Sequence, residues 1–402
     1  MEHHYFLGIK MKILLRAPLL TNSGYGVHSR QIFEWLEEKK DISLFVECLN
    51  WGHTPWVIDP DKEDGLISKI MDRSVALEPP YDIAFQVQLP DEWDPKLGKV
   101  NVGVTAAVET DKCSPKWVEN CNAMDLIIVP STFTKNVIRR SGVLTTRVKV
   151  IPEWFNHHIL SENLNQIYQN DERYNFSTNF NYLIIAQLTA QNPTHDRKNL
   201  FNTLAWLLEY HKNDPDVGIV LKTNFGRGTV LDHMRTTDYL KNLTSRIRKG
   251  SFPKIHLVHG NMSKEEIAAL YHVESVKAYI SATRGEGYGL PLVDAAAAGM
   301  PVIATNWSGH LEFLEKDLFL PVDYDMTEIE EGRVDERIFY KGFRWAEPRK
   351  SSFFKQLNAL SSDYQNHDQN AKKLASNVTK NFHKESIKQK YEEILESLTR
   401  KS

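Results

Sequence analysis

The sequence alternates strand-like and helix-like segments in two separate series, and this alternation limits the fold more than any other feature. The first series has short apolar runs at residues 12–16, 42–48, 83–87, 100–106, 126–129 and 148–151, with helical spacing at 29–39 and 115–124. The second has such runs at residues 182–187, 218–222, 255–259 and 276–282, with helical spacing at 200–211, 238–249 and 264–271. Strands that alternate with helices build parallel, doubly wound sheets. We therefore expect an α/β protein with two such sheets, joined by the polar, asparagine-rich residues 156–181.

The composition is that of an ordinary soluble protein, and 402 residues are enough for two domains. A net charge of -3 gives no reason to expect a nucleic-acid partner. The three cysteines have no metal-ligand spacing and leave an odd thiol in any disulfide scheme, which favours a cytoplasmic location. No apolar run is long enough to span a bilayer, although basic residues between 227 and 254 leave open a peripheral contact with the inner face of a membrane. Residues 1–10 are interpreted as an extension or an upstream start.

The most informative motif follows the last strand-like run and reads Gly285-Glu286-Gly287-Tyr288-Gly289-Leu290-Pro291. Pro291 suits the first turn of a helix, where its missing N–H would have no intrahelical partner, and Gly299 suits the end of that helix. Glycines on either side of Tyr288 let the backbone approach a ligand closely. The N-terminus of a helix offers unpaired N–H groups to an anion. The motif therefore predicts an anion site at the start of a short helix.

Two carboxylates bracket this anion site, because Glu286 precedes the helix and Asp294 lies within it. Amides for a diphosphate and carboxylates for the hydroxyls of a sugar and a ribose suit a sugar nucleotide. An ordinary strand–turn–helix also explains the glycines, but it does not explain a glutamate between two of them. The pattern of Glu286, seven residues and Asp294 resembles the donor-site signature of family-four retaining glycosyltransferases, in which the second acidic residue is a glutamate. Residues 301–309 also resemble that family, as a strand and a glycine turn.

The resemblance covers most of the chain and implies the GT-B fold, in which two Rossmann-like domains face each other across a cleft. Residues 1–156 are then the acceptor-side domain, and residues 157–382 are the domain that binds the nucleotide sugar. The last helix of a GT-B protein commonly crosses back to the first domain, so residues 383–402 are expected to join it. The apolar face of this helix, which carries Ile387, Tyr391 and Leu398, is equally compatible with docking on its own domain.

The donor half also carries candidate cations. His195-Asp196-Arg197-Lys198-Asn199 resembles the family's motif with a phosphate-contacting lysine, which implies that Lys198 stabilises the departing diphosphate and that Arg197 assists it. A solvated pair of basic residues is the alternative. Many relatives have an arginine after the first strand of this domain, where this chain has Gln187, which cannot neutralise charge. We therefore expect Lys222, at the end of the next strand, to supply the missing cation.

The first half contributes two further candidates. Gly24-Tyr25-Gly26 resembles the glycine-rich loop that family members bring to the donor from across the cleft. A dinucleotide fingerprint is disfavoured there, because Ser29 occupies the position of the third glycine. Glu109 follows a strand, where a doubly wound sheet places its ligand, and it resembles a family subset with Glu-Thr-Asp at this position. Glu109 is expected to bind donor or acceptor hydroxyls or to act as a base, with an exposed loop residue as the alternative.

The resemblance implies a retaining glycosyltransferase with Glu286, Lys198 and Glu109 as its catalytic residues. The expected partners are a UDP- or GDP-sugar and a glycan, lipid-linked or protein acceptor. We expect neither a cofactor nor a metal: the pair His157-His158 lacks ligand spacing, and Asp-x-Asp occurs at three unrelated places, two of them in proline-containing turns. A sugar-nucleotide epimerase and a catalytically silent sugar-nucleotide-binding protein stay open as alternatives.

Overall fold

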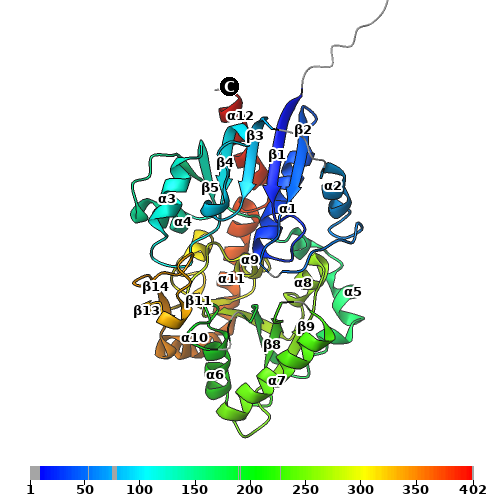
Figure 1. Cartoon of the computed structure of the whole chain (residues 1–402). Helices are drawn as coiled ribbons and strands as arrows, with labels where there is room; N and C mark the ends of the chain where they lie inside the picture. Colours follow the sequence, from blue (N-terminus) through cyan, green and yellow to red (C-terminus); the bar gives the residue numbers. More distant parts are fainter. Residues whose placement is uncertain are drawn as a thin grey trace, which may run out of the picture.

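The computed structural model of the chain consists of two α/β domains and a C-terminal run of helices (Figure 1). The structure describes residues 10–52, 54–74, 79–188, 190, 192–226 and 228–400. The expectation of an N-terminal extension falls almost entirely on residues 1–9, which lie outside the described residues.

The first domain is built on a parallel sheet of six strands in the order β2-β1-β3-β4-β5-β6. Its strands are β1 (Met11–Ala17), β2 (Ile42–Cys48), β3 (Tyr81–Val87), β4 (Gly98–Val104), β5 (Leu126–Val129) and β6 (Val148–Val150). Its helices are α1 (Gly24–Glu37), α2 (Leu66–Arg73), α3 (Pro115–Asn122) and α4 (Thr132–Ser141). The strands β3 and β5 are almost entirely buried, and β1 and β4 are mostly buried beyond their first residues, as expected for a sheet covered on both faces.

The second domain is built on another parallel sheet of six strands, in the order β12-β11-β10-β7-β8-β9. Its strands are β7 (Phe180–Ile185), β8 (Val217–Thr223), β9 (Lys254–His259), β10 (Val276–Ser281), β11 (Val302–Thr305) and β12 (Leu320–Val322). Its helices are α6 (Leu200–Tyr210), α7 (Val230–Ile247), α8 (Lys264–Leu270) and α9 (Leu290–Ala297). A separate hairpin joins β13 (Tyr324–Glu328) to β14 (Arg344–Pro348). Two parallel sheets of this kind confirm the expected fold class.

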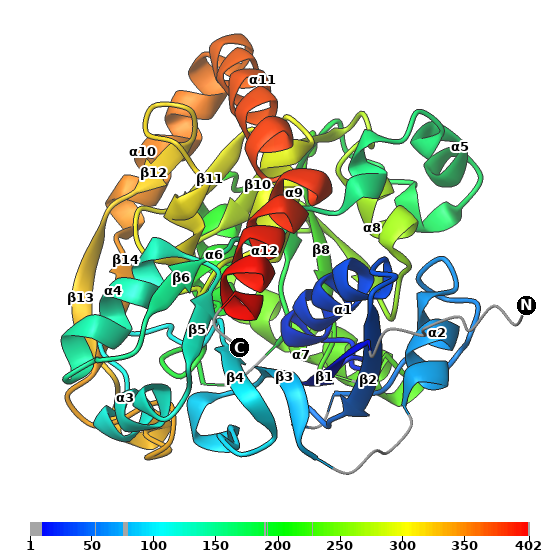
Figure 2. The same cartoon turned by 90° about the horizontal axis from the view of Figure 1, so that it is seen from above.

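The chain ends in α10 (Lys350–Ser362), α11 (Tyr364–Asn381) and α12 (Lys384–Thr399). Of the two placements expected for the last helix, the structure has the crossing: α12 lies beside α1 of the first domain (Figure 2). Its apolar face joins the core of that domain. The Tyr391 hydroxyl lies 3.1 Å from Nε2 of His28, and Nε1 of Trp35 donates to Glu392 over 3.1 Å.

Three regions differ from the sequence-based expectation. Residues 156–181 contain the short helix α5 (Leu164–Gln169), whose buried Leu164 packs on the second domain. Helix α7 begins at Val230, well before the predicted start, because the Thr229 hydroxyl caps it by accepting from the N–H of Asp232 over 3.2 Å. Helix α2 was not predicted. The start of α7 was missed because few residues of this helix are buried, which weakens the periodic apolar signal. Helix α2 is amphipathic, but its eight residues are shorter than the stretch over which a helical period is recognised. Among the helices of the described residues, none is both long and apolar enough to cross a bilayer.

Candidate active site

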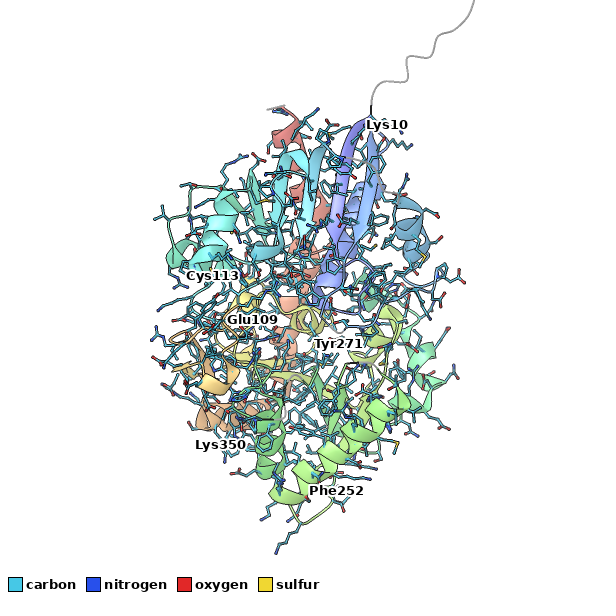
Figure 3. The ribbon with its side chains drawn as sticks, in the orientation of Figure 1. Lys10, Glu109, Cys113, Phe252, Tyr271 and Lys350 are labelled. Carbon is cyan, nitrogen blue, oxygen red and sulfur yellow. The ribbon has the colours of Figure 1, made fainter. Side chains whose placement is uncertain are left out.

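Four charged side chains meet where the two domains face each other. Lys198 and Arg197 precede α6, Glu286 lies between β10 and α9, and Glu109 follows β4 of the first domain. The Nζ of Lys198 lies 2.6 Å from Glu286, whose other oxygen is 3.1 Å from Arg197. Glu109 lies near the meeting of the two domains (Figure 3). Arg197 also contacts Glu109 at 3.1 Å, so this charged cluster crosses the domain boundary. The structure therefore brings together the three residues predicted to be catalytic and adds Arg197 to them.

Glu286 is buried but ionised. Burial alone would raise its pKa, but Lys198 and Arg197 outweigh burial and bring the pKa down to about 2. The Thr283 hydroxyl donates to the same carboxylate over 3.0 Å, and the N–H of Glu286 donates to the Ser308 hydroxyl over 2.9 Å. The carboxylate is therefore held in one position, and so low a pKa keeps it negatively charged at neutral pH.

The helix that was expected to carry the anion site is confirmed in its bounds. Gly289 adopts a φ of +107° before α9, Pro291 lies in the first turn, and Gly299 adopts a φ of +71° after the last turn. A positive φ at both ends is the conformation that glycine adopts without strain. The short helix is therefore delimited by the residues that the sequence indicated.

The glycines before α9 approach the first domain, which differs from the expectation that they approach a ligand. A Cβ on Gly287 would lie 1.8 Å from the carbonyl oxygen of Ala106, and one on Gly285 would lie 2.3 Å from that of Glu109. The Ser131 hydroxyl donates to the carbonyl of Gly287 over 2.7 Å. The loop after β10 thus packs directly against the loop after β4. Glycine is required here because two backbones meet at the domain boundary.

The cavity beside the charged cluster is small. A cavity of about 20 Å³ is lined by Lys198, Glu286, Gly289 and Pro291 together with the ends of β7 and β10. That volume holds about one water molecule. The cavity as it stands is far smaller than the pockets that hold small-molecule ligands.

Tyr288 offers its backbone but not its side chain to a ligand. Its ring is buried, and its hydroxyl donates to the carbonyl of Glu153 over 2.6 Å. The side chain thus anchors the loop before α9 to the end of the first domain. Sequence spacing did not reveal this anchoring role.

Asp294 faces the connection between the domains. Its carboxylate accepts the N–H of Asn156 over 2.8 Å, and burial raises its pKa to about 7. Glu153 lies close by, where burial and the charge of Asp294 raise its pKa to about 8. Oε1 of Glu153 lies 3.9 Å from Nδ1 of the buried His28, and its Oε2 makes no hydrogen bond. The binding of ribose by Asp294 stays a prediction.

Lys222 is not joined to the charged cluster. It is buried, its Nζ donates to the carbonyl of Gly260 over 2.5 Å, and burial lowers its pKa to about 8. Its charged neighbours are Arg173 and Glu266. Within the described part of the chain, no contact links Lys222 to Glu286. The second cation beside Glu286 is Arg197, and the role of Lys222 in replacing the arginine absent at Gln187 stays a prediction.

The predicted glycine-rich loop of the first domain faces the start of α9. A Cβ on Gly24 would lie 3.9 Å from Leu290, whereas one on Gly26 would clash with the carbonyl of Thr21 inside its own turn. The Tyr25 hydroxyl lies 2.9 Å from that of Thr105. Gly24 thus lies near the candidate donor site, while Gly26 serves the local turn.

Arg284 is a positioning residue that sequence reasoning missed. It is buried, pairs with Glu347 at 2.5 Å, and donates to the carbonyls of Pro193 and Asp196 over 2.7 Å each. It therefore fixes the loop that carries Arg197 and Lys198. A basic residue directly before Gly285-Glu286 was the available signal, but its partners come from distant segments.

A second cavity, of about 280 Å³, opens at the ends of β1, β2 and β3 in the first domain. Its lining consists of Arg16, Pro18, Leu49, Asn50, Trp51, Gln88 and Glu92. Trp51 stacks on Tyr25 with ring centroids 3.9 Å apart. Gln88 is only 5% exposed, yet its carbonyl oxygen makes no hydrogen bond. Because β1 lies between β2 and β3, this cavity occupies the point of the sheet where doubly wound folds bind ligands.

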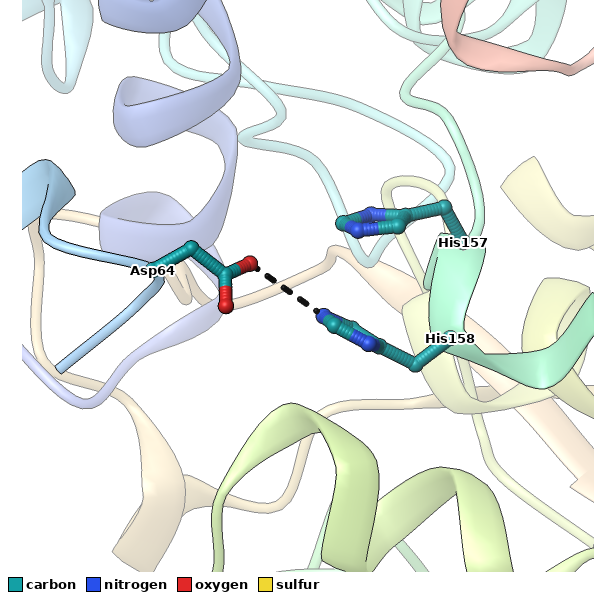
Figure 4. A group of neighbouring side chains, drawn as sticks. All are labelled: Asp64, His157 and His158. Atoms are coloured by element: carbon teal, nitrogen blue, oxygen red, sulfur yellow. Dashed lines mark ion pairs between the residues drawn. The ribbon is translucent and has the colours of Figure 1, made fainter. Parts of the chain in front are cut away.

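Each of the three Asp-x-Asp sequences, at residues 59–61, 214–216 and 323–325, has a partner for at least one of its carboxylates. Asp214 and Asp59 each accept a backbone N–H two residues ahead in a turn, and Asp325 pairs with Arg349. In the part of the chain that the structure describes, one group brings three potential metal ligands within 4.8 Å of one another: Asp64, His157 and His158 (Figure 4). The two histidines lack metal-ligand spacing along the sequence, but the fold places Asp64 beside them, so the three side chains could hold a metal ion together.

The family model described as Glycosyl transferases group 1 matches residues 231–332, a segment that contains both Glu286 and Asp294. Among solved structures, sucrose-phosphate synthase from Thermosynechococcus elongatus aligns with a TM-score of 0.63 and 14% identity, over 98% of this chain and 100% of that one. HepE from Anabaena in complex with UDP-glucose aligns with a TM-score of 0.63 and 14% identity, over 96% and 100% of the two chains. The α,α-trehalose 6-phosphate synthase from Burkholderia multivorans gives a TM-score of 0.60 and 11% identity, over 97% and 99%. No curated protein matches the sequence. The chain thus has the two-domain GT-B fold.

Proposed function

We propose that the protein is a retaining glycosyltransferase that moves a sugar from a UDP- or GDP-sugar to a hydroxyl-bearing glycan, lipid-linked or protein acceptor, without a metal ion in the transfer step. The observation that carries this proposal is the buried ion cluster of Glu286, Lys198 and Arg197 at the start of α9. The fold and the match to Glycosyl transferases group 1 support it. HepE, which shares the fold, was solved with UDP-glucose.

The cluster has the chemistry that departure of a diphosphate requires. A leaving diphosphate gains negative charge in the transition state, and cations held in a dry site stabilise that charge strongly. Lys198 and Arg197 are such cations, and the N-terminal end of α9 adds its dipole. In this proposal Glu286 binds sugar hydroxyls and orients the anomeric carbon. The acceptor hydroxyl attacks on the face that the leaving group vacates, and a diphosphate oxygen takes its proton.

Donor binding and transfer test this proposal directly. A thermal-shift panel of UDP-, GDP-, ADP- and dTDP-sugars should raise the melting temperature with one nucleotide above the others, because binding to the folded state stabilises it. Incubation of that donor with candidate acceptors should yield a glycosylated product with the anomeric configuration retained, and EDTA should not lower the rate. An isomerised nucleotide sugar would instead indicate an epimerase. Stabilisation without hydrolysis or transfer would indicate a binding protein.

We further propose that the first-domain cavity binds an uncharged sugar unit of the acceptor. Trp51 offers an aromatic face, and Asn50 and Gln88 offer amides to hydroxyls, which is a typical lining of a polar ligand pocket. The charges in the lining are compensated: Arg16 pairs with Glu47 at 3.1 Å, and Glu92 pairs with Arg337 at 2.6 Å. A neutral sugar therefore fits this cavity better than a phosphorylated one.

Trp51→Ala is expected to raise the KM for the acceptor about fivefold and to leave the KM for the donor unchanged, because loss of the aromatic face costs about 1 kcal/mol of acceptor binding. Trp56→Ala is the matched control, since Trp56 is 40% exposed and does not line the cavity. Steady-state kinetics with each substrate varied in turn measure both constants. An unchanged acceptor KM in Trp51→Ala would place the acceptor elsewhere.

A further inference from the structure

Asp64, His157 and His158 form a converging set of metal-ligating side chains outside the charged cluster. Each offers one ligand atom, and the three atoms lie within 4.8 Å of one another. The two imidazole rings lie one above the other with centroids 4.0 Å apart, and both present an edge to the Asp64 carboxylate (Figure 4). A zinc ion holds such nitrogen and oxygen atoms at about 2.0–2.2 Å, so inward shifts of about an ångström complete the coordination.

A further carboxylate, that of Glu265, lies beside the group but is not among the three atoms that lie within 4.8 Å of one another. Oε1 of Glu265, at the start of α8, lies 3.2 Å from Nε2 of His158, and Oδ2 of Asp64 lies 3.5 Å from the same atom. This nitrogen is buried, and it makes no hydrogen bond although two carboxylates are close to it. Two carboxylates and two neutral imidazoles give a net charge that a divalent cation neutralises. The nearby cations are already paired, Lys264 with Glu63 at 2.5 Å and Lys384 with Glu34.

The four side chains come from three parts of the molecule. Asp64 lies before α2 in the first domain, the histidines lie in the connection between the domains, and Glu265 lies in the second domain. The N–H of Asn156, one residue before His157, donates to Asp294 beside the candidate donor site. A metal ion bound by this set would therefore tie the first domain to the second on the side of the molecule where the chain passes between them.

We propose that Asp64, His157, His158 and Glu265 form a binding site for a divalent transition-metal ion, with Zn²⁺ as the best fit, that holds the two domains together. Ligands of this kind, two imidazoles and two carboxylates, suit zinc in a closed four-coordinate site. The site takes no part in the proposed glycosyl transfer. The bound ion links the first domain to the second, so the occupancy of the metal site controls how readily the two domains separate.

Metal binding is measured on the full-length protein after treatment with a chelator, with His3 and His4 replaced by Gln so that the N-terminal histidines do not contribute. Titration with Co²⁺ should give visible absorption bands of a four-coordinate site that saturate at one equivalent, and Zn²⁺ should displace the Co²⁺. Zn²⁺ should also raise the melting temperature, because it binds the folded state alone. No nucleotide or acceptor is present, so the outcome is independent of the proposed glycosyl transfer.

Asp64→Asn and His158→Gln should each weaken Co²⁺ binding by at least about tenfold, since even changes outside the ligands commonly cost that much. Asp61→Asn is the matched control, because Asp61 lies in the same loop but outside the group, and it should leave binding unchanged. Equal Co²⁺ affinity in wild type and Asp64→Asn would overturn the proposal, as would saturation well below one equivalent. A six-coordinate spectrum would overturn the closed zinc site.

Discussion

Glu286→Gln is expected to lower kcat by about 10²–10³-fold, the loss seen when one preorganised polar group is removed from a transition state. The substitution keeps the shape of the side chain but removes the charge that pairs with Lys198 and Arg197 and that, in the proposed transfer, orients the sugar. Nucleotide binding should persist, because both cations remain available to the diphosphate. Turnover measured at saturating donor and the dissociation constant of the nucleoside diphosphate separate the two effects.

Two comparisons make this result specific to the charged cluster. Glu315→Gln, which changes an acidic residue that contacts Asn377 outside the cluster, should keep the wild-type kcat. Lys198→Met should lose turnover to a similar degree, and the double variant should fall little further, because residues that act as a unit are non-additive. Wild-type turnover in Glu286→Gln would remove this carboxylate from the mechanism. Fully additive losses would show that Glu286 and Lys198 act separately.

Glu153→Gln is expected to flatten the pH dependence of stability. Burial, with the charge of Asp294 as a second cause, raises the pKa of Glu153 from 4.5 to about 8. Between these values the folded protein keeps a proton that the unfolded chain has released, so the free energy of unfolding falls as the pH rises. A pKa change of this size corresponds to at most about 5 kcal/mol, lost fully only above the folded-state pKa.

Urea denaturation of wild type and Glu153→Gln at about pH 5 and about pH 9 measures this difference. Glutamine stays neutral throughout, so the variant should lose less stability between the two pH values than the wild type does. Glu162→Gln, at an exposed position in the nearby connection, should follow the wild type. Parallel curves for wild type and Glu153→Gln would show that the Glu153 carboxyl does not keep its proton in the folded protein.

The elements that the sequence predicted well are those with strong local signals. Strands such as β2 and β5 were predicted at their observed bounds, because short apolar runs between turns have few alternative structures. Helix α9 was delimited by Pro291 and Gly299 for the same local reason. The start of α7 was missed because few side chains of this helix are buried, and α2 was missed because its eight residues are too few to show a helical period.

The candidate site was predicted in part, and the division follows from how each side chain is held. Glu286 was found from the residues of its glycine-rich motif, and Lys198 from the resemblance of residues 195–199 to a family motif. Arg197 was given a supporting role, and it lies directly against Glu286 because the loop before α6 is anchored by Arg284. No local pattern identifies such an anchor, since its partners are carbonyls that only the folded chain brings within reach.

By itself the sequence determined the two parallel sheets, the short helix after Glu286 and the presence of acids and cations around it. These features depend on residues that are close to one another in the sequence, so their spacing can be read directly from it. Only the tertiary structure decided that Gly285 and Gly287 pack against the backbone of the first domain. The same holds for the position of Asp64 beside His157 and His158. Such contacts join segments far apart in the chain, and their geometry is set by how the two sheets pack against each other.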